Sequence, residues 1–179
     1  IVFLGTSDFA APILDSLKKS FEVVSIFSSP DQIIDADELK KLEPDLFVVA
    51  SFGKILNNQV LQIPKYGAIN IHPSLLPKYR GASPIQSAIL NGDKTTGVTI
   101  IKMDEDVDHG PILFQKEADL NDKDTFETLS KKLFKLGADH LPQVLNDYIT
   151  GKLKPIPQIH SKATFTKLLT KQDGFIDTG

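Results

Sequence analysis

The chain of 179 residues contains no cysteine. This absence excludes disulfides, thiolate metal sites and a cysteine nucleophile. No apolar run approaches the ~20 residues that a membrane-spanning helix needs, and no cationic leader precedes the first apolar run. Acidic and basic residues are nearly balanced, 23 against 20, so the bulk charge does not indicate a polyanionic partner, although a local basic patch could still bind one. These features predict a cytoplasmic protein with no membrane partner. We also expect a monomer.

Apolar runs alternate with helical patterns along the chain. Buried strands are predicted at residues 1–4, 22–28, 46–51, 68–72, 97–103 and 112–118. The longest predicted helix begins at the capping-box-like Asp124-x-x-Glu127 and continues to about residue 149. Continuous apolar strands between helices are typical of a parallel sheet that is covered on both faces. The sequence therefore predicts an α/β, Rossmann-like fold, with a mostly parallel twisted sheet and helices on both faces.

Two polar residues at the end of the strand at 68–72 are the strongest candidates for catalysis. Asn70 and His72 are two positions apart, so their side chains point to the same face. In open α/β sheets, ligands bind outside the carboxyl ends of the strands. A histidine and a carboxamide that converge there can polarise a carbonyl group and stabilise an oxyanion. The alternative is a buried histidine with a structural role, but the stiff, apolar loop at 73–77 favours a ligand site.

The acidic turn at 104–108 supplies a third candidate, Asp108. Alone, this turn could hold a divalent metal or be a solvated loop. It lacks the spacing of a twelve-residue calcium loop, and we expect no metal site. Beside His72, the charge of Asp108 would favour a protonated imidazole and fix its orientation.

The turn Gly5-Thr6-Ser7 follows the first strand without the complete G-x-G-x-x-G spacing of a dinucleotide site. A tight strand-to-helix turn is the simpler interpretation. A non-catalytic nucleotide- or metal-binding module is the alternative from a different functional class.

Several motifs together resemble the formyltransferase superfamily that uses 10-formyltetrahydrofolate. They are Asn70-x-His72, Ser74-Leu75-Leu76-Pro77, Tyr79-Arg80-Gly81-Ala82-Ser83-Pro84-Ile85-Gln86, Thr96-Gly97-Val98-Thr99 and Asp108-x-Gly110. The opening Gly5-Thr6-Ser7-Asp8-Phe9-Ala10 and the run from Arg80 to Gln86 are most similar to the branch that formylates initiator methionyl-tRNA. The resemblance covers nearly the whole chain.

The resemblance implies roles for individual residues. It implies that Asn70, His72 and Asp108 are catalytic, and that Ser74, Leu75, Leu76 and Pro77 contact the pterin of the folate cofactor. The implied donor is 10-formyltetrahydrofolate, and the implied acceptor is the α-amine of initiator methionyl-tRNA, with no metal. Arg80 lies in the matching turn without an assigned role.

The resemblance also implies the domain organisation. Residues 1–154 would form the catalytic domain, and residues 155–179 a linker toward a C-terminal β-barrel domain that this chain does not contain. Only about 15 residues, Pro30 to Pro44, separate the second and third strands, where the family has a longer basic insertion. We therefore expect a break in the chain within residues 28–36.

Two other formyl-transfer activities share the donor. Hydrolases of 10-formyltetrahydrofolate carry similar loops but lack the asparagine at the position of Asn70. Amino-sugar formyltransferases keep the asparagine and histidine but diverge over residues 83–86. Both stay open as alternatives to methionyl-tRNA.

Overall fold

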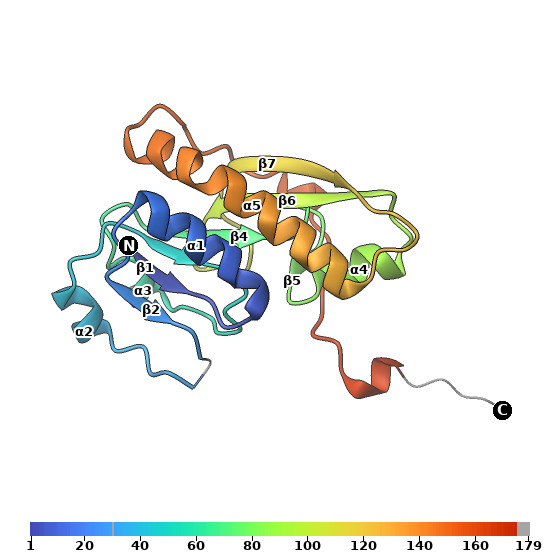
Figure 1. Ribbon diagram of the computed structural model, residues 1–179, viewed down its shortest axis with the longest axis horizontal. Helices are drawn as coiled ribbons and strands as arrows, with labels where there is room; N and C mark the ends of the chain where they lie inside the picture. The colour runs from blue at the N-terminus through green and yellow to red at the C-terminus, as the bar shows by residue number, and fades with distance from the viewer. Residues whose placement is uncertain (30, 175–179) are drawn as a thin grey trace.

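The computed structural model describes residues 1–29 and 31–174 (Figure 1). Its main sheet has the strand order β2-β1-β3-β4-β6-β7. These strands are β1 (Val2–Leu4), β2 (Ser25–Phe27), β3 (Phe47–Val49), β4 (Ala68–His72), β6 (Thr95–Lys102) and β7 (Ile112–Asp119). The pairs among β2, β1, β3 and β4 are parallel, and β6 runs antiparallel to both β4 and β7. Five of the six strands thus share one direction, which confirms the predicted, mostly parallel α/β sheet.

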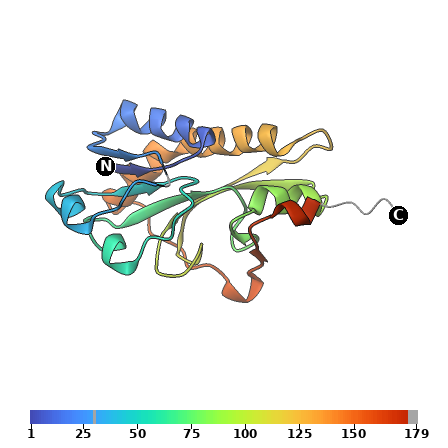
Figure 2. The same ribbon diagram turned by 90° about the horizontal axis from the view of Figure 1, so that it is seen from below.

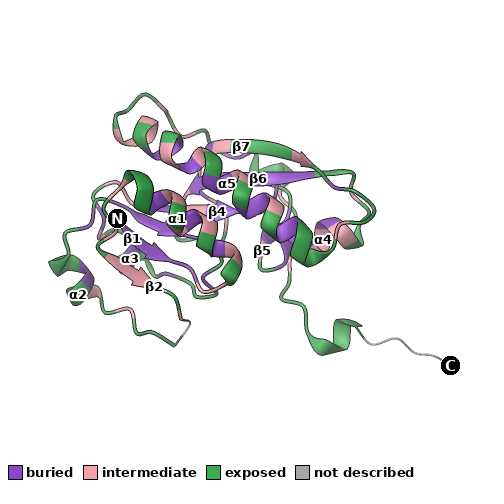
Figure 3. Ribbon diagram, viewed as in Figure 1, coloured by how far each residue is buried: buried purple, intermediate pink, exposed green. Residues whose placement is uncertain are grey.

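Helices cover both faces of this sheet, as the continuous apolar strands predict. The helices α1 (Ala11–Ser20) and α5 (Phe126–Ile149) pack together on one face, whereas α2 (Ala36–Lys41) and α3 (Asn58–Leu61) lie on the other (Figure 2). Strand β3 shows the alternation, because Val48 packs with the α1 and α5 side while its two neighbours in the strand pack with α2 and α3. The central strands are accordingly buried along their length (Figure 3).

The long helix α5 begins one residue later than its sequence signal suggests. Thr125 is the N-cap, and its hydroxyl accepts a hydrogen bond from the Thr128 amide at 3.2 Å. Asp124 instead accepts from the Asn121 amide at 2.9 Å. Farther along, Gly137 brings the helix close to the sheet, since a Cβ there would lie 2.9 Å from Cγ2 of Ile71. The helix therefore packs directly on β4, the strand that carries the candidate residues.

The remaining elements are short. Helix α4 (Pro84–Leu90) contacts α5, and the short helix η1 (Asp8–Ala10) precedes α1. Strand β5 (Arg80–Gly81) pairs in parallel with β8 (Phe165–Thr166), and η2 (His160–Lys162) and η3 (Lys171–Gly174) flank that strand. Among the described residues, no helix is both long and apolar enough to cross a membrane.

Two expectations about the course of the chain stay predictions. The expected break within residues 28–36 includes Pro30, which lies outside the described residues. The domain boundary after residue 154 is also untested. The structure adds that residues beyond this boundary contact the domain: Ile156 forms an antiparallel bridge with Ile112, with both backbone hydrogen bonds 2.8 Å long.

Candidate functional site

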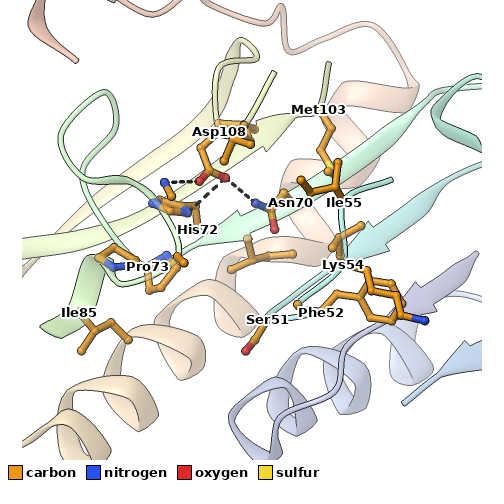
Figure 4. A pocket seen from close by; sticks show the side chains of 18 of the residues that line it. Ser51, Phe52, Lys54, Ile55, Asn70, His72, Pro73, Ile85, Met103 and Asp108 are labelled. Carbon is orange, nitrogen blue, oxygen red and sulfur yellow. Dashed lines mark hydrogen bonds and ion pairs between the residues drawn. The ribbon is translucent and has the colours of Figure 1, made fainter. Parts of the chain in front are cut away.

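Asn70 and His72 project from β4, where the sheet changes from parallel to antiparallel pairing. Both side chains meet Asp108 (Figure 4). Asn70 Nδ2 donates to Asp108 Oδ1 at 3.1 Å, and Nδ1 of His72 lies 3.4 Å from the same oxygen. The His72 side chain is almost fully buried. The structure thus places Asn70 and His72 on one face, as their spacing predicts, and brings Asp108 to both of them.

Asp108 reaches this position by a route that the sequence pattern does not show. Because β6 runs antiparallel to β4, its last residue, Lys102, pairs with Ile69 rather than ending beside His72. The turn that follows must therefore come back toward the carboxyl end of β4. Asp108 makes that turn with a φ of 50°, in the left-handed region that non-glycine residues rarely adopt. Its Oδ2 accepts a hydrogen bond from the Gly81 amide at 2.8 Å.

The two ring nitrogens of His72 face different acceptors. Nε2 lies 2.9 Å from the carbonyl oxygen of Tyr79, and this oxygen can only accept, so Nε2 carries a hydrogen. A second proton, on Nδ1, would make the contact with Asp108 a charge-assisted hydrogen bond. Without it, a lone pair would face the carboxylate. The geometry therefore suits an imidazole that is protonated on both nitrogens.

A cavity of about 520 Å³ contains these side chains. Figure 4 shows Asn70 and His72 in the middle, with Ile55 and Met103 on one side and Ile85 on the other. Apolar side chains thus line the cavity on both sides of the polar cluster, and Phe9, Phe126 and Leu168 also belong to its lining. Charged side chains line it as well: Lys54 beside Ile55, and Asp104, Glu105 and Asp106 in the turn after Met103. A polar cluster with apolar groups on two sides can bring two substrates together at one point.

The loop to which the resemblance assigns the cofactor follows directly after a cavity-lining residue. Pro73 lines the cavity, but Ser74, Leu75, Leu76 and Pro77 are not among its lining residues. Several backbone groups of this loop are hydrogen-bonded within the protein: the Thr99 hydroxyl donates to Ser74 O at 2.6 Å and accepts from Leu76 N at 3.1 Å. Gln115 Nε2 donates to Leu76 O at 2.9 Å. The cofactor role of residues 74–77 stays a prediction.

Residues of two other sequence features, the turn at 5–7 and the acidic turn at 104–108, interact within the protein. Thr6 lines the cavity, and its hydroxyl donates to Ser51 O at 2.9 Å. In the acidic turn, Asp104 pairs with His109 at 2.7 Å. Within residues 1–29 and 31–174, no group of three or more metal-ligating side chains is placed to hold an ion.

Two contacts of the site were not predicted from the sequence. The first is the hydrogen bond from the Gly81 amide to Asp108, although the motif from Arg80 to Gln86 that contains Gly81 was recognised. Gln158 is the other, and its amide binds the backbone of the Asp108 turn. It lies in a stretch that reads as a linker, so no pattern marked it.

The chain is similar to known proteins in both sequence and fold. A sequence profile of the Formyl transferase family matches residues 35–145. The chain is 40% identical to the methionyl-tRNA formyltransferase of Kosmotoga olearia, over 97% of this chain and 66% of that protein. It is also 40% identical to the enzyme of that name from Thermotoga maritima, over 99% of this chain and 67% of that protein. The chain thus spans about two thirds of the length of these relatives.

The alignments with these relatives run over 206 and 210 residues, so both proteins carry segments that this chain of 179 residues lacks. Solved structures show the same fold. The methionyl-tRNA formyltransferase from Clostridium thermocellum has a TM-score of 0.80 at 19% identity, over 99% of this chain and 75% of that one. HypX from Aquifex aeolicus, in complex with tetrahydrofolic acid, has a TM-score of 0.81 at 20% identity, over 98% and 31%.

Proposed function

Because this chain belongs to the formyl transferase family, we propose that it transfers the formyl group of 10-formyltetrahydrofolate to the α-amine of initiator methionyl-tRNA. One observation carries the proposal: Asn70, His72 and Asp108 meet inside a cavity that has apolar side chains, Ile55 and Met103 on one side and Ile85 on the other, around them. A donor can enter from one end and an acceptor from the other, with the formyl carbon between them. The names of the relatives favour methionyl-tRNA as the acceptor.

The donor would occupy the end formed by Phe52, Ile55 and Met103. Flat heterocycles bind well in apolar slots that contain a few polar groups, and a folate pterin is such a ring. The tetrahydrofolic acid in the HypX complex, a protein of the same fold, is consistent with this choice. This placement differs from the contact with residues 74–77 that the resemblance implies. In that loop Ser74 O, Leu76 N and Leu76 O are hydrogen-bonded within the protein.

The acceptor side chain would occupy the opposite end. We place it at Ile85, together with Phe9 and Phe126, which also line the cavity and meet edge to face with ring centroids 5.6 Å apart. Methionine has a flexible, polarisable thioether that packs well against aromatic rings. A charged side chain would lose part of its hydration against these apolar groups.

The chemistry then needs only charge stabilisation at the formyl oxygen. An α-amine has a pKa of about 7.7–8, so a useful fraction is neutral at pH 7. Its nitrogen bonds to the formyl carbon, and the C=O π pair moves onto oxygen. Asn70 has a second N–H to donate to this oxyanion, and His72, protonated and held by Asp108, adds positive charge. Collapse reforms C=O and breaks the bond to N10, which leaves with the proton that the attacking amine releases.

The release of tetrahydrofolate from 10-formyltetrahydrofolate tests the proposal. We expect release with methionyl-tRNA, and none with uncharged tRNA or with donor alone. Release with donor alone would indicate a hydrolase. Release with an amino-sugar nucleotide, but not with methionyl-tRNA, would move the assignment to a sugar-modifying transferase.

A further inference from the structure

Gln158 differs from the rest of the C-terminal segment in its burial. Gln158 is 4% exposed, whereas its neighbours Ile156 and Ile159 are 66% and 58% exposed. The described residues 151–174 are otherwise exposed or half-buried. Burying a glutamine is costly unless all its polar atoms are hydrogen-bonded, so its contacts should explain why it is there.

The Gln158 amide has four hydrogen bonds, its full capacity. Nε2 donates to the carbonyl oxygens of Asp108 at 2.9 Å and Gly110 at 2.8 Å. Oε1 accepts from Arg80 Nε at 3.1 Å and from Arg80 Nη2 at 2.6 Å. The amide orientation is unambiguous, because a guanidinium can only donate and a backbone carbonyl can only accept. Gln158 therefore joins the Asp108 turn to the residue before Gly81.

Both of these segments determine where the Asp108 carboxylate lies. The turn carries Asp108 with its unfavourable φ of 50°, a conformation that persists only where the surroundings enforce it. The next segment supplies the Gly81 amide, which donates to Asp108 Oδ2. The Gln158 side chain thus binds the backbone of the turn that carries Asp108, and it also binds Arg80, the residue before the Gly81 amide that donates to Asp108 Oδ2.

The position of Gln158 is itself fixed from both sides. Before it, the backbone bridge between Ile156 and Ile112 anchors the segment to β7. After it, His160 Nδ1 accepts from Arg80 Nη2 at 2.9 Å, and the His160 ring stacks on His109 with centroids 4.1 Å apart. Then β8 pairs with β5. The amide is held rigidly enough to orient another group.

We propose that Gln158 is a positioning residue for formyl transfer, which sets the Asp108 carboxylate against Asn70 and His72 by holding the turn at 108–110 and Arg80 together. Residues 156–166 are accordingly part of the catalytic unit. The proposal rests on the proposed function, because it requires Asp108 to act in the reaction.

Two substitutions distinguish the hydrogen bonds of Gln158 to the turn at 108–110 from its hydrogen bonds to Arg80. Gln158→Leu removes all four bonds at similar volume. Gln158→Glu keeps an acceptor for Arg80 but turns a carboxylate oxygen toward the two carbonyl oxygens, so the hold on the turn is lost. We expect both variants to lower kcat by about 10- to 100-fold, the size of effect that follows a misplacement of ~1 Å, with little change in KM for the donor. Gln143→Leu, at an exposed glutamine that bonds Asp147 at 2.8 Å, is the matched control and should retain wild-type kcat.

Hydrogen exchange of the Gly81 amide provides a readout that does not depend on activity. We expect faster exchange in Gln158→Leu and Gln158→Glu, and wild-type exchange in Gln143→Leu. In an Asp108→Asn background, Gln158→Leu should reduce kcat little further, because it acts through Asp108. If Gln158→Leu does not fold, Gln158→Glu decides the test.

A kcat within twofold of wild type, or unchanged Gly81 exchange in folded Gln158 variants, would overturn the positioning role. So would full activity of Gln158→Glu, since only the contact with Arg80 would then matter. If the wild-type chain formylates no acceptor, the proposed function fails by itself, and the Gly81 exchange still reports whether Gln158 holds the turn.

Discussion

Nδ1 of His72 lies 3.4 Å from Oδ1 of Asp108, while Nε2 of the same ring lies 2.9 Å from the Tyr79 carbonyl oxygen. Both nitrogens thus face acceptors within the protein. The histidine is therefore suited to act through its positive charge rather than as a proton acceptor. Asp108 contacts both Asn70 and His72, so its charge and its position should govern activity more than those of its acidic neighbours.

Neutralising Asp108 should separate it from the rest of the acidic turn. Asp108→Asn keeps the shape of the side chain but removes the charge beside His72, and we expect turnover to fall by ~10²–10³, the usual cost of losing one oxyanion-stabilising group. Asp106→Asn removes a charge from the same turn at an exposed position that lines the cavity, and it should lower turnover far less. Steady-state formyl transfer measures both. Equal losses in the two variants would show that the turn acts through its total charge.

The two residues should behave as one unit. We expect His72→Ala and Asp108→Ala each to lower kcat strongly, and the double variant to lose much less than the product of the single losses. Thermal unfolding of each variant checks that the fold is kept. Fully multiplicative losses would mean that His72 and Asp108 contribute independently.

A carboxylate at position 70 should be worse than no side chain. Asn70→Ala loses one donor, at a cost of ~10²–10³ in turnover. Asn70→Asp also places a second carboxylate about 3 Å from Asp108, where two charges cannot both ionise freely, so its activity should be lower still. Asn58→Asp offers a matched exposed pair, because Asn58 donates to Glu105 at 3.1 Å, and it should change little. Higher activity in Asn70→Asp than in Asn70→Ala would contradict the donor role.

Chelation should leave the activity unchanged. The mechanism draws its stabilising charge from His72 and its hydrogen-bond donor from Asn70, so no ion is needed at the formyl oxygen. We expect the same turnover before and after dialysis against a chelator. Loss of turnover that one divalent ion restores would show that a metal takes part.

Gly110 should be important for stability as well as for the site. A Cβ at this position would lie 1.8 Å from the Lys102 carbonyl oxygen, so the backbone must shift to accommodate Gly110→Ala. We expect a loss of about 1–3 kcal/mol in the free energy of unfolding, the range for overpacking, together with reduced turnover. Gly174→Ala, where a Cβ meets nothing within 4 Å, is the control. Denaturant unfolding of both variants makes the comparison.

The strands of the sheet and the faces of their side chains could be predicted from the sequence, because buried strands have a recognisable pattern of apolar residues. The apolar runs predicted all six strands of the main sheet, and the spacing of Asn70 and His72 placed both on one face. The C-terminal segment was not accessible in the same way. Its contacts are backbone pairs and a single polar side chain, Gln158, and neither changes the apolar pattern.

The sequence by itself determined the α/β architecture and the pairing of Asn70 with His72, because both follow from local periodicity. Only the tertiary structure decided what lies beside them. Asp108 is 38 residues from Asn70 along the chain, and Gln158 is 50 residues from Asp108. Their meeting depends on the antiparallel direction of β6, a left-handed backbone angle and the path of the C-terminal segment. Such contacts follow from the packing of the whole chain, since no local pattern specifies which distant groups complete one another's hydrogen bonds.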